Sequence, residues 1–292
     1  MKLVRFSQGG GAQRLGLTDG SAIAPLSNWG IDTGSMIDVI ERWSELKAQL
    51  AEISEFTLPL DDVRLHAPIA RPNKVLGIGL NYAEHAAEGG MQPPSEQMWF
   101  AKPATAVNGP FDDIKRPVVS DQLDYEVELV VIIGKRCRHL SREDAANAIF
   151  GYCVGNDVSV RDWQLKTSQV FLGKAFDGHA PFGPWITTAD CFDPADAGIH
   201  SFVNDQQRQS SRTSRMVFDC AAQVALLSQV MTIEPGDVIF TGTPSGVGGL
   251  MNPPTWLVPG DVVRAEVEGL GYIQNTIVAE KIGEVVSQGQ NG

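Results

Sequence analysis

The chain has 292 residues, of which 43% are hydrophobic and 20% are charged, so it can bury a core and intrinsic disorder is excluded. Its formal net charge is −12 and no block of Lys or Arg stands out, which argues against a nucleic-acid partner. The apolar run at residues 129–133 is far shorter than the roughly 20 residues that span a bilayer, so we expect no membrane partner.

The N-terminus reaches a glycine cluster without the apolar stretch that a secretory signal requires. We therefore expect a cytoplasmic protein. The cysteines show no CxxC spacing, so free thiols are expected rather than disulfides or a zinc site. They are Cys137, Cys153, Cys191 and Cys220.

Residues 1–70 predict a small N-terminal domain that is rich in strands. Short apolar segments at 3–7, 14–20 and 21–26 are separated by glycine-rich breaks, and a helix is expected over 36–50. The proline-rich stretch 58–74 then leads into a new apolar run. We place the domain boundary near Arg71.

Residues 71–292 predict a second domain made mostly of strands, so the expected fold class is α+β with β dominant. Its β-branched runs include residues 74–80, 125–134, 237–242 and 262–269. Two helices are expected within it. One covers 141–150, where Ser141 and Asp144 fit a capping box, and the other covers 216–231.

Glu126 and Glu128 are the strongest local anomaly. In a strand, alternate residues share a face, so the two carboxylates would project side by side next to the apolar run Leu-Val-Val-Ile-Ile. Like charges held together in an interior strand favour a cation between them, and oxygen ligands suit Mg²⁺, Mn²⁺ or Ca²⁺. The alternative is a solvated edge strand that carries two protective charges.

A metal site needs a third ligand, and Asp157 follows a second apolar segment at a strand end, where side chains commonly point into a site. The alternative for Asp157 is a simple Asx turn. Upstream, His85 and Glu88 are three residues apart and would be neighbours on one helical face. A glutamate can orient an imidazole so that it activates water, although a surface contact remains the alternative for this pair.

Several separated strings, in this order, resemble the fumarylacetoacetate hydrolase superfamily. They span residues 74–278 and read GIGLNYAEH, WFAKPATAVNGP, DYEVELVVIIGK, GYCVGNDVSVRDWQ, LGKAFDGHAPFGPW, VNDQQRQSSRTSRMVFD and IFTGTPSGVG.

The resemblance implies a mixed β-roll catalytic domain that is usually a homodimer and binds Mg²⁺ or Mn²⁺, with Ca²⁺ also conceivable in crystals. It assigns the metal ligands to Glu126, Glu128 and Asp157, and the water-activating pair to His85 and Glu88. Lys174 matches the lysine of the family's GK[AS]F string, and the resemblance implies that it stabilises a developing oxyanion.

The resemblance also implies that Arg161, Gln164 and Thr243 contact the carboxylate or carbonyl oxygens of a substrate. Loop architecture is the alternative role for these three residues.

The reaction that the resemblance favours is the hydrolytic cleavage of a C–C bond in an acylpyruvate-like 2,4-dioxo acid, a small-molecule substrate, giving pyruvate and a carboxylic acid. The same metal platform also serves decarboxylases of the oxaloacetate type, isomerases, hydratases and other lyases, so these remain open. A further alternative is a metal- or metabolite-binding protein without catalysis.

Overall fold

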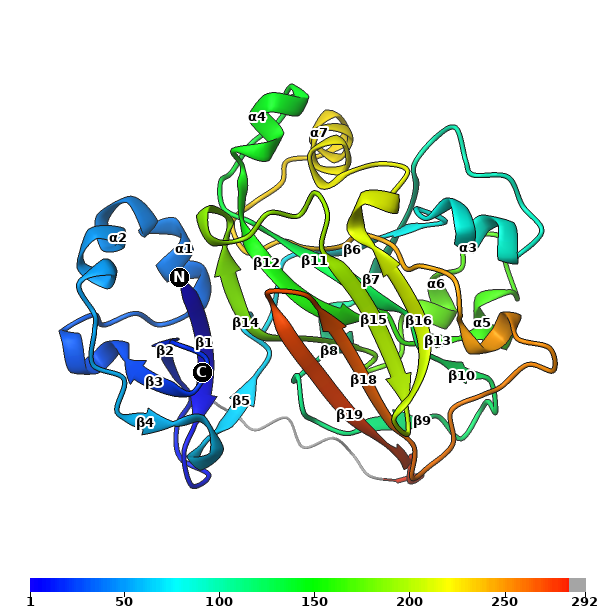
Figure 1. Ribbon diagram of the computed structural model, residues 1–292, viewed down its shortest axis with the longest axis horizontal. Helices are drawn as coiled ribbons and strands as arrows, with labels where there is room; N and C mark the ends of the chain where they lie inside the picture. Colours follow the sequence, from blue (N-terminus) through cyan, green and yellow to red (C-terminus); the bar gives the residue numbers. More distant parts are fainter. Residues whose placement is uncertain (284–292) are drawn as a thin grey trace.

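The computed structural model describes residues 1–283 and is built mainly from strands, as the expected α+β class requires (Figure 1). The largest sheet mixes parallel and antiparallel pairs, with β5 (Arg64–His66) on β1 and β8 (Val107–Asn108) on β14. Its main path runs through β4 (Leu58–Pro59), β3 (Ala22–Pro25), β2 (Arg14–Thr18), β1 (Lys2–Ser7), β14 (Ala180–Thr188), β12 (Ile149–Asn156), β11 (Val127–Ile133), β17 (Val238–Phe240), β6 (Val75–Gly79) and β7 (Met98–Lys102).

A second sheet lies against the first, and a two-stranded ladder stands beside the site described below. The ladder pairs β10 (Leu123–Asp124) with β13 (Ser159–Val160). The second sheet contains β16 (Gln206–Arg212), β15 (Gly198–Val203), β18 (Val262–Val267), β19 (Gly271–Ala279) and β9 (Ile114–Arg116).

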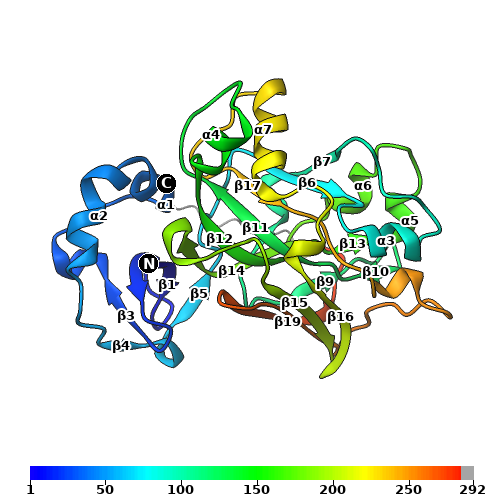
Figure 2. The same cartoon turned by 45° about the horizontal axis from the view of Figure 1, so that its top comes forward.

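The seven α-helices of residues 1–283 are short and lie around the sheets (Figures 1 and 2). None of them has the length and hydropathy needed to cross a membrane. They are α1 (Met36–Glu41), α2 (Trp43–Ala51), α3 (Ala83–Glu88), α4 (Arg142–Ala146), α5 (Arg161–Gln164), α6 (Phe171–Lys174) and α7 (Cys220–Val230).

The N-terminal strands continue the main sheet instead of forming a sheet of their own. Strand β1 pairs antiparallel with β14, where Leu3 lies opposite Ile186, and also with β2 and β5. Figure 1 shows this unit in blue at one end of the molecule. The division into two domains at Arg71 stays a prediction, because backbone hydrogen bonds join the two units.

Two of the expected helices differ from the structure. The helix expected over 36–50 is two helices that meet at Arg42. The helix expected over 141–150 ends at Ala146, because Ile149 already belongs to β12, which is buried between β11 and β14. The expected cap is present, since the Asp144 N–H donates to the Ser141 hydroxyl at 3.1 Å.

Helix α7 begins later than the expected 216–231, because Asp219 caps it by accepting a hydrogen bond from the backbone N–H of Ala222 at 2.8 Å. It packs against α4, and both views show the two helices together above the sheets (Figures 1 and 2). All four cysteines are free thiols, as expected.

Strand β11 lies at the centre of the fold, and its alternation divides the core in two. Val130 and Ile132 face the cluster that includes the N-terminal unit, whereas Leu129 and Val131 face α7 and the second sheet. Each of these side chains is at most 1% exposed. Full burial of such a residue contributes about 1.5–3 kcal/mol, so β11 is a rigid base for whatever its polar residues hold.

Candidate metal centre and active site

Glu126, Glu128 and Asp157 come together because β11 and β12 pair antiparallel. Val127 lies opposite Asn156, so Glu126, just before β11, faces Asp157, just after β12. The Asp157 N–H donates to the carbonyl oxygen of Glu126 at 2.9 Å, and the Glu126 N–H donates to the side-chain oxygen of Asn156 at 2.9 Å. These bonds hold the ends of both strands in register.

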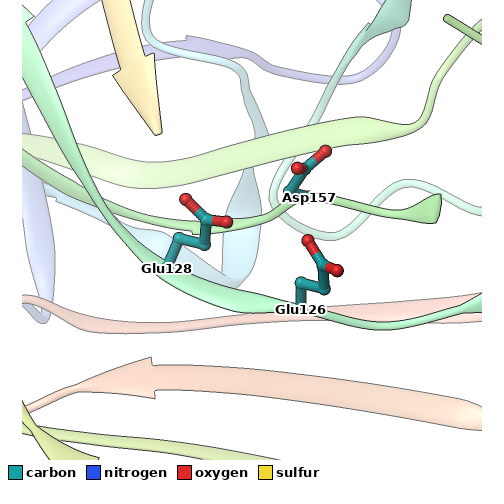
Figure 3. A group of neighbouring side chains, drawn as sticks. All are labelled: Glu126, Glu128 and Asp157. Atoms are coloured by element: carbon teal, nitrogen blue, oxygen red, sulfur yellow. The ribbon is translucent and has the colours of Figure 1, made fainter. Parts of the chain in front are cut away.

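The three carboxylates converge on one point, as Figure 3 shows. One oxygen from each lies within 4.8 Å of the others. Glu126, Glu128 and Asp157 are 5%, 1% and 0% exposed. Strand β11 is flanked by β12 and β17, so the alternative of a solvated edge strand is excluded for the two glutamates. A simple surface turn is excluded for Asp157 on the same ground of burial.

Charge crowding is visible in the electrostatics of the cluster. Burial raises the pKa of Glu128 well above its usual value, and the carboxylates of Asp157 and Glu126 add to the rise. Burial also acts to raise the pKa of Glu126, but the cations of Lys174 and Arg161 outweigh it, so that pKa lies below its usual range. The cluster therefore favours added positive charge.

Lys174, which sequence comparison with the family singled out, lies directly in this cluster. Its ammonium is 2.6 Å from Glu126 Oε2 and 2.6 Å from Asp157 Oδ2, and the side chain is 2% exposed. Helix α6 places it there. The ammonium of Lys174 thus lies between two carboxylates of the cluster, as expected where negative charge attracts a cation.

Lys102 was missed by the sequence reasoning and is equally close. Its ammonium donates to Asp157 Oδ1 at 2.6 Å and to the carbonyl oxygen of Val158 at 3.2 Å, and its side chain is completely buried. Burial lowers the pKa of Lys102, although Asp157 partly opposes this. The available signal was a lysine that ends the apolar strand β7 and directly precedes a proline.

Arg161, in α5, bridges the cluster to the ladder beside it. Its Nη1 is 2.7 Å from Glu126 Oε1, its Nε donates to Asp124 Oδ2 at 2.8 Å, and its Nη1 also donates to Gln164 Oε1 at 2.9 Å. Its Nη2 is buried, and no hydrogen-bond partner for it lies within residues 1–283. Arg161 belongs to the wall of the pocket that the carboxylates face.

Thr243 has its hydroxyl fully engaged. The hydroxyl donates to the carbonyl oxygen of Val127 at 2.9 Å and accepts from the Gln209 amide at 2.8 Å. Next to it, the Gly242 N–H donates to Glu128 Oε2 at 2.7 Å. The loop after β17 thus fixes Glu128, and Thr243 also forms part of the pocket wall.

His85 and Glu88 form a pair on α3, as their spacing predicted. His85 Nδ1 is 3.3 Å from Glu88 Oε2, and both Glu88 oxygens accept from the Gly246 N–H at 3.0 and 3.1 Å. The two side chains are only 12% and 22% exposed. His85 belongs to the pocket wall, whereas Glu88 lies outside it.

A cavity of about 710 Å³ joins these residues. Besides apolar side chains, its wall contains seven of the nine candidate residues, and the other two, Asp157 and Glu88, are not part of it. The seven are His85, Glu126, Glu128, Arg161, Gln164, Lys174 and Thr243. Helices α3, α5 and α6, which supply four of them, stand together at the end of the molecule away from the N-terminal unit (Figures 1 and 2).

The donor set fits a hard divalent cation. Mg²⁺ and Mn²⁺ prefer carboxylate oxygens, and three of these converge at the wall of a cavity large enough for water and a substrate to complete the coordination. A site for a softer metal would be expected to contain cysteine, and no cysteine belongs to this group.

Comparison with known proteins agrees with the resemblance. The family model described as fumarylacetoacetate (FAA) hydrolase C-terminal matches residues 74–278, and one described as Rv2993c-like, N-terminal matches residues 1–68. The fumarylacetoacetate hydrolase domain-containing protein 2 homolog of Dictyostelium discoideum is 44% identical over 249 residues, 81% of each chain. The mitochondrial oxaloacetate tautomerase fahd2 of Xenopus laevis is 39% identical over 95% of this chain and 90% of its own.

Among solved structures, maleylpyruvate hydrolase from Sphingobium sp. SYK-6, in complex with manganese(II) ion and pyruvate, superposes with a TM-score of 0.80. It is 35% identical, and the alignment covers 96% of this chain and all of that one. The family match covers more than two thirds of the chain and includes every candidate residue. The chain therefore belongs to the fumarylacetoacetate hydrolase family.

Proposed function

We propose that this protein is a divalent-metal-dependent enzyme that cleaves the C–C bond of an acylpyruvate-like 2,4-dioxo acid by hydrolysis. The observation that supports the proposal most is the placement of His85, which Glu88 contacts at 3.3 Å, on the same cavity as the buried carboxylates of Glu126 and Glu128. A water-activating base and a metal centre are the two parts that this reaction needs.

Glu126, Glu128 and Asp157 would hold a divalent ion, and the proposal includes both Mg²⁺ and Mn²⁺. The bound ion would polarise the 2-oxo group and stabilise the negative charge that develops on its oxygen. The guanidinium of Arg161 fits the 1-carboxylate of the substrate, because Arg161 lines the cavity beside Glu126 and its Nη2 has no partner among the described residues.

His85 would take a proton from water while the resulting hydroxide attacks C4. Glu88 keeps the imidazole oriented through Nδ1, and the Gly246 N–H keeps Glu88 in place. The C3–C4 bond then breaks, its electron pair stays on C3, and a proton returned to C3 completes pyruvate. C4 leaves as a carboxylic acid. Lys174 supplies positive charge next to the site where the negative charge develops.

The test uses metal-stripped protein and the same protein restored with Mg²⁺ or Mn²⁺, incubated with acetylpyruvate while pyruvate and acetate are both measured. We expect equal amounts of the two products, and only after metal is restored. His85→Gln should lose turnover by at least about a hundredfold and keep its metal affinity. His200→Gln, on β15 outside the cavity, is the matched control. Normal turnover by His85→Gln would contradict the mechanism.

A second candidate reaction is the tautomerisation of oxaloacetate. It is supported by the name of the Xenopus relative, an oxaloacetate tautomerase that is 39% identical over nearly the whole chain. This reaction needs only a proton moved between C3 and the 2-oxo oxygen, so His85 would act on carbon and no water would be consumed. Metal-dependent loss of the enol absorbance of oxaloacetate, without pyruvate from acetylpyruvate, would favour it.

Release of CO₂ and pyruvate from oxaloacetate would instead indicate a decarboxylase. Metal binding with no turnover across these substrates would indicate a binding protein. A homodimer and a cytoplasmic location also belong to this proposal. Sedimentation of the purified chain and fractionation of cells that express it are the respective tests, and the second matters because the Xenopus relative is named as mitochondrial.

A further inference from the structure

The cavity has two chemically different ends. At one end lie the carboxylates with Lys174 and Arg161. At the other end the wall is mainly apolar and comes from β7, the turn after α3 and the start of α6, with two neutral polar residues, Ser168 and Gln169, just before α6. Its apolar side chains include Met91, Met98, Phe100 and Phe171.

Phe100 marks the border between the two ends. The β6–β7 register places it opposite Gly77, where a Cβ atom would lie 2.3 Å from the Phe100 ring. The ring therefore lies across a position that only glycine leaves open. The ammonium of Lys174 lies 4.9 Å from the centre of the same ring. Phe100 is thus fixed between the charged centre and the apolar wall.

The cations of the cavity are all at the charged end. Lys174 is bound to Glu126 and Asp157, and Arg161 is bound to Asp124 and Glu126. No other Lys or Arg of the described chain belongs to the cavity wall. A carboxylate at the apolar end would therefore lose part of its hydration without finding a cation to pair with, whereas a neutral group would not.

Resting on the proposed function, we infer that the apolar end is an acyl subsite for a neutral alkyl or aryl group. The substrate is then a 2-oxo acid with one carboxylate, at the metal end, and dicarboxylates that reach the far end are disfavoured. Met98 and Met91 are the residues that determine this preference. They are 50% and 46% exposed, and methionine adapts to acyl groups of different shape.

The test compares kcat/KM for two acylpyruvates of similar length, pentanoylpyruvate and succinylpyruvate, which ends in a carboxylate. We expect a preference for the pentanoyl substrate of at least about tenfold. Met98→Arg places a cation in the apolar wall and should reduce that preference by about tenfold or reverse it. Leu172→Arg is the matched control, because Leu172 is 43% exposed but lies outside the cavity wall.

Acetylpyruvate, whose acyl group is too short to reach the far end, reports whether Met98→Arg still has an intact metal centre. If that variant fails to fold, Met91→Arg makes the same test from another side of the wall. Equal or better cleavage of succinylpyruvate by the unaltered protein would overturn the acyl subsite while leaving the hydrolase reaction in place.

If neither acylpyruvate is cleaved, the proposed reaction fails but the subsite is still tested by binding. Thermal stabilisation of the Mn²⁺-loaded protein is then compared for 2-oxooctanoate and 2-oxosuberate, which differ only in a terminal methyl or carboxylate group. A larger rise in Tm with 2-oxooctanoate supports the apolar subsite. An equal or larger rise with 2-oxosuberate overturns it.

Discussion

The backbone N–H of Asp157 donates to the carbonyl oxygen of Glu126 at 2.9 Å, so a backbone hydrogen bond links two of the three residues whose carboxylates converge. This hydrogen bond extends the β11–β12 ladder by one step beyond Val127 and Asn156. The carboxylates are held together before any ion binds, and their mutual repulsion is part of the folded state. Ion binding and folding stability should therefore respond in opposite directions to changes at this cluster.

Glu128→Gln is expected to show this opposition. The amide oxygen of glutamine can still accept the 2.7 Å hydrogen bond from the Gly242 N–H. The neutral side chain also removes the repulsion between a carboxylate at position 128 and those of Glu126 and Asp157. The metal-free variant should be at least as stable as the unaltered protein, whereas its affinity for Mn²⁺ should fall at least about tenfold. Titration calorimetry and thermal unfolding without metal measure the two effects. A destabilised metal-free variant would contradict this reasoning.

Lys102→Met should have the opposite effect on the metal-free protein. It removes the cation 2.6 Å from Asp157 Oδ1 and leaves a fully buried carboxylate with less compensation. Breaking a buried ion pair from one side costs about 3 kcal/mol. Saturating Mn²⁺ should recover part of that loss, because the ion replaces the missing charge. Urea unfolding with and without Mn²⁺ measures it, and Lys166→Met, on the surface, is the control.

Alternation along one strand was enough to predict that Glu126 and Glu128 lie together, because a period of two is a local property of the backbone. Lys102 could not be found in that way. It is 55 residues from Asp157 in sequence, and only the order of β7, β6, β17, β11 and β12 in the sheet brings it near. The position of Asp124 under Arg161 depends likewise on the β10–β13 pairing.

The expected helix over 141–150 failed for a related reason. The cap at Ser141 is a local signal and was correct, but the place where α4 ends is decided by the burial of Ile149 and Phe150 in β12 and its neighbours. In the same way, the strand-rich character of the N-terminal unit was predicted, but nothing local indicated that β1 would pair with β14. The pairing of strands that are far apart in the sequence cannot be predicted from the local sequence pattern.

Gly77→Ala tests the packing of Phe100. A Cβ atom at this position would lie 2.3 Å from the Phe100 ring, so the ring must move toward the cavity or the strand must shift. Such overpacking costs about 1–3 kcal/mol. Gly34→Ala is the control, since a Cβ there meets no atom within 4 Å and Gly34 has no positive φ. Urea denaturation should separate the two variants clearly, and equal stabilities would show that the ring adapts without cost.

The stability of the protein should fall as the pH drops from about 6.5 to about 4, in part because of His179. Burial lowers the pKa of His179 from 6.5 to about 4, and the hydrogen bond between its Nε2 and the carbonyl oxygen of Lys115, at 2.9 Å, opposes this only partly. The unfolded chain takes up the proton first as the pH falls, so unfolding becomes easier across this window. The full shift corresponds to about 3 kcal/mol.

His179→Gln keeps a donor for the Lys115 carbonyl and removes the titrating group, so its free energy of unfolding should depend less steeply on pH between about 4 and 6.5. The slope should not vanish, because the pKa of His66 is also lowered to about 4, by burial and by Arg5 and Arg64. His139→Gln, at an exposed site, is the matched control. Urea titrations at several pH values measure the slopes, and an unchanged slope in His179→Gln would show that the buried imidazole does not titrate as inferred.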